Sequence, residues 1–336
     1  MKKLFKFVII LYTLAALSPA SARYIYVPFD KSMQKLENAP VSYKYKVLKD
    51  LYDQHNPDIL HSLDEDLIPK TIHQIWLGPY KLPKEFKKYS QLWQELHPDW
   101  QYKLWTEKDV KTLNFPDRDL YEKASSYQEK SEILKFTILK QFGGLYADVD
   151  YKPVRKFDYL HHTYKFYGGI SPPPEKTNDI HISTSIIASE PNNLIMKLAL
   201  KRIRDVWDDA EKEFHKEKHV DNTDISLLYK KRVEESFNYI VANKIHYVQR
   251  AIILPPTYLN IIIRNKLVDP YLEAIGINSR QRFFHIIHRE TLASERKDGT
   301  RLVSNLSKKT IDENLLLRNF KKAKTLVLDF YHKYSY

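Results

Sequence analysis

The stretch from Ser131 to Asp150 decides the fold of this chain, and it reads S-E-I-L-K-F-T-I-L-K-Q-F-G-G-L-Y-A-D-V-D. Its first half places apolar residues such as Leu134 and Ile138 at helical spacing. Ser131 is a candidate cap for the start of this helix. The pair Gly143-Gly144 predicts its end, because glycine readily takes the left-handed conformation of a helix stop. We expect a short buried strand to follow.

Two carboxylates come directly after that strand, which we predict over Leu145–Ala147. Side chains two apart in a strand point the same way, so Asp148 and Asp150 are expected to converge at its carboxyl end. Open α/β sheets bind their ligands at that edge. Ionised aspartate oxygens are hard ligands, suited to Mn²⁺ or Mg²⁺ that also holds water and substrate phosphates. On the motif alone, an ordinary Asp-x-Asp turn is the alternative.

The whole stretch resembles the glycosyltransferases of family 32, a group that includes mannosyltransferases and has the typical text S-D-x-x-R-x-x-x-L-x-x-x-G-G-x-Y-x-D-x-D. It is also similar to the glucosyltransferase domains of the large clostridial toxins. The resemblance implies a GT-A type α/β fold, with a Rossmann-like mixed, mainly parallel sheet flanked by helices and with helical N- and C-terminal appendages. It further implies a retaining enzyme that uses Mn²⁺ or Mg²⁺ to move a hexose from a UDP- or GDP-linked donor to a glycan, lipid or protein acceptor.

An earlier stretch, Thr71–Gly78, carries the same resemblance and reads T-I-H-Q-I-W-L-G. In the toxin relatives the matching tryptophan stacks on the nucleotide base, which implies that role for Trp76 and a backbone contact with the base for Ile75. Stacking of a base on an aromatic ring is worth about 1–3 kcal/mol. From the residues themselves, alternating strand and helix patterns after Thr71 favour a parallel sheet. We interpret His73, in an apolar strand, as a hydrogen-bonded core residue.

Glu132 and Lys135 lie three apart on the predicted helix and therefore share one face. Their residue types alone predict a solvated ion pair that contributes little. The resemblance instead implies that both bind the donor, at positions where relatives usually have Asp and Arg. Lysine keeps the charge of arginine but lacks its planar, bidentate fork. The asparagine that relatives have near Thr184 is also absent.

A third part of the resemblance is the stretch Phe283–Glu290, F-F-H-I-I-H-R-E, in which a histidine follows an apolar strand. It implies that His288 approaches the metal or the diphosphate, with His285 as the weaker candidate. The final Ser-Trp pair of the family is altered, because Glu295 stands where the tryptophan is expected.

Composition excludes several classes of chemistry. The 336 residues include no cysteine, so disulfides, zinc–thiolate sites and thiol nucleophiles are ruled out. The formal net charge is +12, yet the sequence has neither an RNA-binding signature nor zinc-finger spacing. We therefore expect no nucleic-acid partner. The basic surface permits peripheral contact with an anionic membrane.

The predicted organisation has four parts. A basic start, an apolar run over Phe7–Leu17 and the small residues Ala20-Ser21-Ala22 predict a signal peptide at 1–22. It predicts secretion or export, with anchoring in the membrane of a secretory compartment as the alternative. The other parts are a helical N-terminal extension at 23–67, the glycosyltransferase domain at 68–295 and a basic C-terminal helical segment at 296–336.

Two other functions compete with the transferase. A haloacid-dehalogenase-like phosphatase also uses Asp-x-Asp after an apolar strand, but it expects Thr or Val where Lys152 stands. The second is a sugar- or nucleotide-binding protein on a decayed transferase scaffold, which the departures at Glu132, Lys135 and Glu295 suggest.

Overall fold

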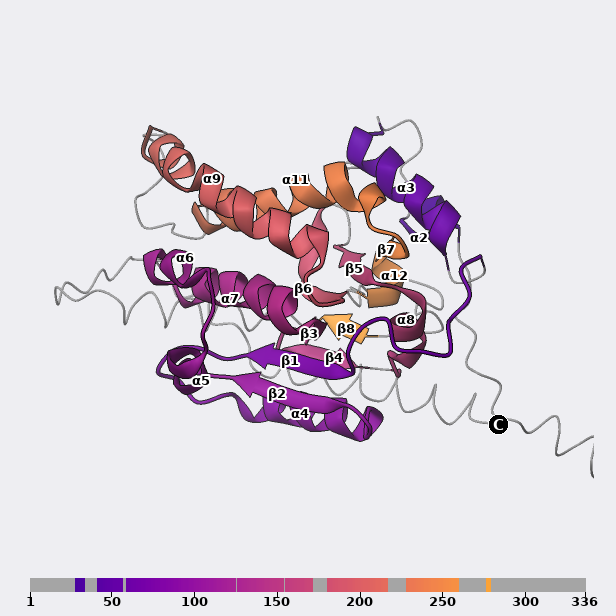
Figure 1. Ribbon diagram of the computed structural model, residues 1–336, viewed down its shortest axis with the longest axis horizontal. Coiled ribbons are helices and arrows are strands. Elements are labelled where there is room, and N and C mark those ends of the chain that lie inside the picture. The colour runs from indigo at the N-terminus through magenta and orange to yellow at the C-terminus, as the bar shows by residue number, and fades with distance from the viewer. Residues whose placement is uncertain are drawn as a thin grey trace, which may run out of the picture. The chain divides into compact units, whose positions relative to one another are not determined.

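The computed structural model of the chain describes residues 28–33, 41–56, 59–124, 126–153, 155–171, 180–216, 228–259 and 276–278 (Figure 1). Four of the sequence predictions lie outside these residues. They are the signal peptide at 1–22, the histidines His285 and His288, Glu295, and the C-terminal segment at 296–336.

A six-stranded sheet organises the fold, with the strand order β2-β1-β3-β6-β5-β7. Strand β6 runs antiparallel to both of its neighbours, β3 and β5, whereas the pairs β1–β2, β1–β3 and β5–β7 are parallel. The expected mixed, mainly parallel sheet is thus confirmed. Its strands are β1 (Thr71–Ile75), β2 (Gln101–Trp105), β3 (Gly144–Ala147), β5 (Phe166–Ile170), β6 (Ile182–Ser189) and β7 (Ala251–Leu254). A smaller antiparallel sheet pairs β4 (Tyr151–Pro153) with β8 (Gly276–Asn278).

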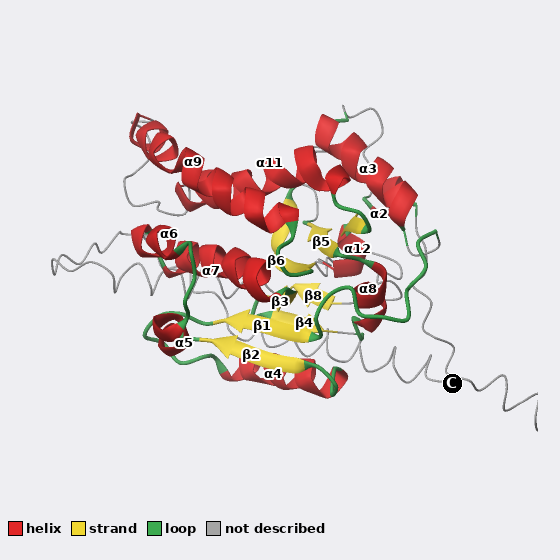
Figure 2. Cartoon of the chain, viewed as in Figure 1, coloured by secondary structure: helices red, strands yellow, loops and turns green. Residues whose placement is uncertain are grey.

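Helices flank the sheet, as the sequence predicts (Figure 2). In Figure 1, α7, α9 and α11 lie above β1, and α4 lies on its other side. No helix within the described ranges is long and apolar enough to cross a membrane. The α-helices are α2 (Phe29–Ser32), α3 (Tyr43–His55), α4 (Lys84–Leu96), α5 (Glu107–Thr112), α6 (Arg118–Lys123), α7 (Tyr127–Phe142), α8 (Asp158–Thr163), α9 (Leu194–Lys216), α11 (Glu235–Lys244) and α12 (Pro256–Leu259), with a π-helix η1 (Lys230–Glu234) and a 3₁₀ helix η2 (Ile245–Tyr247).

Helix α7 starts five residues earlier than expected, at Tyr127. Its cap is Ser126, whose hydroxyl accepts a hydrogen bond from the Glu129 N–H at 3.1 Å. The expectation that Ser131 caps the helix is therefore wrong, because the residues before Ser131 continue the helical turn. The end of the helix is as predicted, at Gly143, whose φ is +66°.

The double glycine after α7 is required by close packing. Gly144 has φ +96°, and a Cβ atom there would lie 2.6 Å from the Thr71 carbonyl oxygen. His73 crosses from β1 to this turn and hydrogen bonds to the Gly143 carbonyl through Nε2 at 3.0 Å. Its Nδ1 accepts a hydrogen bond from the Trp105 indole at 3.2 Å. Both ring nitrogens are engaged, which confirms His73 as a core residue.

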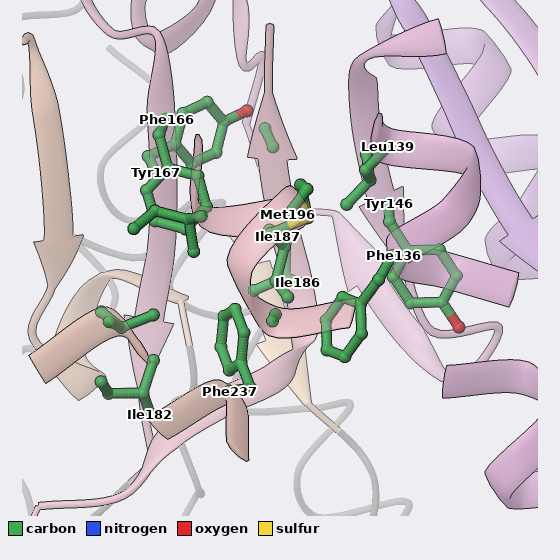
Figure 3. Close-up of a cluster of buried hydrophobic side chains, with 14 of the residues drawn as sticks. Phe136, Leu139, Tyr146, Phe166, Tyr167, Ile182, Ile186, Ile187, Met196 and Phe237 are labelled. Carbon is green, nitrogen blue, oxygen red and sulfur yellow. The ribbon is translucent and has the colours of Figure 1, made fainter. Parts of the chain in front are cut away.

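The hydrophobic core lies where α7 and α11 cover β6 (Figure 3). All eight residues of β6 are buried. Phe136 of α7 stacks on Phe237 of α11 with ring centroids 5.2 Å apart. Strand β6 is therefore buried on both faces, although four of its eight residues, Ser183, Thr184, Ser185 and Ser189, are polar.

The N-terminal helix α3 belongs to the same core. Its Tyr52 hydroxyl lies 3.0 Å from the Tyr258 hydroxyl of α12. At its end, His55 Nδ1 lies 2.7 Å from the Ala251 carbonyl oxygen of β7. These contacts hold α3, which lies within the helical extension predicted at 23–67, against the edge strand β7 of the sheet.

Replacing Gly144 by alanine is expected to lower the free energy of unfolding by at least about 2 kcal/mol, because the new Cβ meets backbone and the φ angle is disfavoured for L-residues. Denaturant unfolding measures this. Gly168→Ala is the matched control, since a Cβ there makes an ordinary 3.5 Å contact with Ile253. Equal stability of the two variants would contradict the strained turn.

The buried imidazole of His73 predicts an acid-sensitive fold. Burial lowers the pKa of His73 from 6.5 to about 4, so the unfolded chain binds a proton at a pH where the folded chain does not. Its contribution to stability is complete above pH 6.5 and is lost as the pH falls towards 4. Between about pH 7 and about pH 5, His73→Gln should lose about 2 kcal/mol less free energy of unfolding than the unaltered chain. If both proteins lost the same free energy of unfolding over this pH range, the lowered pKa of His73 would be contradicted.

Candidate functional site

Asp148 is held at the carboxyl end of β3 by hydrogen bonds to its backbone. Its N–H donates to the Ser185 carbonyl of β6 at 2.8 Å. Its carbonyl accepts from the Tyr151 N–H at 2.9 Å and from the Gln74 side-chain amide at 3.1 Å. The backbone at Asp148 is therefore tied to β1, β6 and the following turn, which leaves it little freedom to move.

The Gln74 side chain can take only one orientation in this arrangement. Its Oε1 accepts hydrogen bonds from the Ser90 hydroxyl at 2.8 Å and the Tyr102 hydroxyl at 2.6 Å. The amide nitrogen is then the atom that faces Asp148. Motif reasoning missed Gln74. A polar side chain inside the apolar strand of β1 was the signal that could have found it.

The Asp148 side chain is held at one oxygen. The Tyr146 hydroxyl donates to Asp148 Oδ1 at 2.9 Å, and Lys135 Nζ lies 3.7 Å from the same oxygen. Tyr146 stands two residues before Asp148, so the two-residue period of a strand could have predicted that both share a face. The sequence reasoning did not apply that rule to Tyr146.

Lys135 is a fully buried cation. Its Nζ donates to Glu132 Oε1 at 2.6 Å and to the Thr184 carbonyl of β6 at 2.7 Å, and it lies 4.4 Å from the centroid of the Tyr146 ring. The side chains of Lys135 and Glu132 are 0% and 5% exposed. The solvated ion pair that the residue types predicted is therefore wrong. Helix α7 is covered by protein on this face, and a pair there must satisfy its charges internally.

Asp150 lies beside Asp148 but not on the same strand. Strand β3 ends at Ala147, and the chain then turns, with the Tyr151 N–H bonded to the Asp148 carbonyl. Asp148 and Asp150 were expected to converge because side chains two apart in a strand point the same way. That reason is wrong, because the strand ends before both residues. Both residues still stand at the carboxyl end of β3, and Asp150 is 5% exposed.

Ile75 and Trp76 lie at the same edge of the sheet. Strand β1 pairs in parallel with β3 through Ile72–Leu145 and His73–Tyr146, so both strands end at that edge. The Trp76 N–H donates to the Trp105 carbonyl at 2.9 Å, and its indole N–H donates to the Tyr80 carbonyl at 2.6 Å. The indole is partly exposed, as a stacking platform needs to be.

The chemistry of these side chains fits a hard divalent cation. Two aspartates in a short turn offer oxygen ligands, and Mg²⁺ or Mn²⁺ takes one or two carboxylates together with water and phosphates. Within the part of the chain that the structure describes, no group of three or more His, Asp or Glu residues could hold a metal ion. The predicted further ligand, His288, lies outside those residues.

Residues 83–167, about a quarter of the chain, match a family model described as "Glycosyltransferase sugar-binding region containing DXD motif". The matched range includes Glu132, Lys135, Asp148 and Asp150, whereas Trp76 precedes it. The resemblance stated from these residues is confirmed over this range.

Two curated relatives are similar to part of the chain. Inositol phosphoceramide mannosyltransferase 3 of Schizosaccharomyces pombe is 31% identical over 126 residues, which are 36% of this chain and 35% of that protein. The mannosyl phosphorylinositol ceramide synthase SUR1 of Saccharomyces cerevisiae is 30% identical over 142 residues, 41% of this chain and 35% of that protein. The chain thus spans about a third of the length of these relatives. Among solved structures, the PaToxG glycosyltransferase has a TM-score of 0.42 at 20% identity and covers 60% of this chain and 80% of that chain.

Replacing Lys135 by methionine should lower the free energy of unfolding by about 3 kcal/mol or more, because it leaves the buried Glu132 carboxylate without its cation. Lys201→Met is the matched control. Lys201 also pairs with an acid on its own helix, Asp205, but its side chain is 67% exposed, so a change within about 0.5 kcal/mol is expected. Denaturant unfolding compares the two. A small effect at Lys135 would contradict the buried ion pair.

Proposed function

We propose that this chain is a retaining, metal-dependent glycosyltransferase that moves a hexose from a UDP- or GDP-linked donor to a glycan, lipid or protein acceptor. The observation that carries the proposal is the pair Asp148 and Asp150 at the carboxyl end of β3, inside the range that matches the DXD family model. The names of the two yeast relatives favour a mannosyl donor and an inositol-phosphate lipid acceptor as the first substrates to test.

The donor site of this proposal uses the edge where β1 and β3 end. Trp76 stacks on the nucleotide base, and Ile75 contacts the base through its backbone. Asp150 holds the metal ion directly. Asp148 contacts it through water, or binds ribose and sugar hydroxyls. His288 is the proposed further ligand to the metal or the diphosphate. Glu132 and Lys135 form the inner side of the donor site, because Lys135 contacts Asp148.

The reaction breaks the bond between the sugar and the diphosphate, and the diphosphate leaves with the electron pair. A bound Mn²⁺ or Mg²⁺ supplies stabilisation of the charge that develops on those phosphate oxygens. The acceptor hydroxyl attacks on the face from which the diphosphate departs, and its proton passes to the departing phosphate. Asp148 and Asp150 act by orienting the departing diphosphate and the metal ion that would bind it. Stabilising the charge on that leaving group is the contribution that lowers the barrier most.

The proposal also includes delivery outside the cytosol, through the predicted signal peptide at 1–22 or by anchoring of that segment in a secretory compartment. Peripheral contact with an anionic membrane is compatible with the basic charge of the chain, which is +12.

A donor-hydrolysis screen tests the proposed function. The full chain is incubated with GDP-mannose and other UDP- and GDP-sugars in Mn²⁺, Mg²⁺ or EDTA, and release of the nucleoside diphosphate is measured. We expect metal-dependent release from one donor. Asp150→Asn should reduce it by about 100-fold or more at unchanged melting temperature, because an amide replaces the charged ligand of the metal.

The matched control is Asp209→Asn, which removes a carboxylate whose side chain is 79% exposed on α9 and should leave release unchanged. Full activity of Asp150→Asn, or equal release in EDTA, would contradict the metal role. If the chain binds a donor but shows no turnover, even when an inositol-phosphate lipid acceptor is added, the alternative function is favoured. That alternative is a sugar- or nucleotide-binding protein on a decayed transferase scaffold.

A further inference from the structure

We propose that the exposed side of α4 is a docking surface for an anionic lipid bilayer. The inference rests on the proposed function, because a transferase with a lipid acceptor has to reach that acceptor at a membrane. It assigns to one helix the membrane contact with which the net charge of the chain, +12, is compatible.

Four lysines and a tyrosine gather at the start of α4 and in the loop before it. All five residues are exposed, and we call them the α4 lysine surface: Tyr80, Lys81, Lys84, Lys87 and Lys88. The three lysines on the helix share one side of it, because residues three and four apart are neighbours on a helix. The buried side chains of α4 lie on its other side, and they are Phe86, Ser90 and Trp93.

The lysines of this surface have no counter-charge in the protein. Within the described ranges, none of the four forms an ion pair, whereas the exposed Lys201 of α9 pairs with Asp205. The one acid between residues 79 and 92 is Glu85, which accepts a hydrogen bond from the Tyr89 hydroxyl at 3.2 Å. The α4 lysine surface therefore carries an excess of positive charge that has to be balanced from outside the chain.

The position of these lysines on the helix is unfavourable for the isolated protein. Lys84 is the first residue of α4, and Lys87 and Lys88 follow in the next turn. The start of a helix carries a partial positive charge, which disfavours cations there. Like charges three and four residues apart also repel each other. Negative charge placed against this end of α4 relieves both effects, which favours an anionic partner.

The residue types favour a lipid surface over a single phosphate group or a nucleic acid. All four cations are lysines, which attract phosphates as point charges, whereas arginine has the planar fork that binds one phosphate through two oxygens. Beside them, 40% of the surface of Tyr80 is exposed. A tyrosine has an apolar ring and a polar hydroxyl, and such side chains are enriched at the level of the lipid headgroups.

Helix α4 also lies against the proposed donor site. The Trp76 indole N–H donates to the Tyr80 carbonyl at 2.6 Å, and the centroid of the Trp76 ring lies 6.4 Å from that of Phe86. Further along α4, the Trp93 indole donates at 3.1 Å to the carbonyl of Tyr151, the residue that follows the aspartate motif. A bilayer docked on α4 is thus separated from these residues by the width of one helix, about 10–12 Å.

Vesicle co-sedimentation of the full chain tests the proposal. The vesicles contain phosphatidylcholine alone or phosphatidylcholine with phosphatidylserine. The triple variant Lys84→Gln, Lys87→Gln, Lys88→Gln should weaken partitioning onto the anionic vesicles by about 100-fold, because each lysine near such a surface contributes about fivefold. High salt should release the unaltered chain, because it screens this attraction.

The matched control makes the same change in net charge on another helix. The triple variant Lys197→Gln, Lys201→Gln, Lys212→Gln removes three exposed lysines from α9, which lies on the other side of β1 from α4 in Figure 1. It should change partitioning by less than about threefold, because charges farther than a Debye length from the lipid are screened. Neither triple variant should change donor hydrolysis measured without vesicles, since none of these lysines belongs to the donor site.

A second measurement shows which part of the chain touches the lipid. The chain has no cysteine, so Gln91→Cys creates a single labelling position on the exposed side of α4, and Asp208→Cys creates one on α9. With anionic vesicles, an environment-sensitive fluorophore at position 91 should shift its emission to shorter wavelength. The same fluorophore at position 208 should not. This comparison holds even where other segments of the full chain also bind lipid.

The outcomes separate docking from catalysis. Equal losses of partitioning in the two triple variants, or no emission shift at position 91, would overturn the docking surface, and donor hydrolysis would still decide the proposed function. Binding of single-stranded RNA instead of vesicles, if lost in the α4 variant, would assign the surface to nucleic acid and also overturn the proposal. If the chain docks through α4 but hydrolyses no donor, the proposed function fails and the docking surface stands.

Discussion

The buried ammonium of Lys135 is the interaction on which the arrangement of this fold most depends. A charge without contact with water must be compensated by the protein, or the folded state loses several kcal/mol. The compensation comes from three elements at once, since Glu132 lies on α7, Asp148 follows β3 and the Thr184 carbonyl lies on β6. Helix α7 and the antiparallel strands β3 and β6 therefore meet at Asp148, where the aspartate motif begins.

The same helix carries further buried charge towards its start. Glu129, Glu132 and Lys135 follow one another at intervals of three along α7, and all are buried. At the far end, Arg232 of the π-helix η1 lies 3.5 Å from Glu129 and stacks over Trp207 of α9. Helix α7 is therefore buried along most of its length and is not an amphipathic surface helix.

Much of the fold could be predicted because its signals are local. A helix that ends at Gly143 needs only the positive φ of glycine, and the strand that follows, β3, is a short apolar run directly after that turn. The aspartate motif was found for the same reason. Two features were not found. The contact of Gln74 with the Asp148 carbonyl joins residues 74 positions apart in the sequence. The burial of Lys135 depends on the elements packed over α7, which are also distant in the sequence.

By itself, the sequence determined the order of helices and strands, the turn at the double glycine and the candidate metal ligands. These follow from backbone preferences and side-chain chemistry, which neighbouring residues decide. Only the tertiary structure decided that Glu132 and Lys135 face inward, and that Asp148 and Asp150 are joined by a turn rather than by a continuing strand. The physical reason is that burial and electrostatic compensation belong to groups distant in sequence, so a surface ion pair and an internal one have the same spacing on the helix.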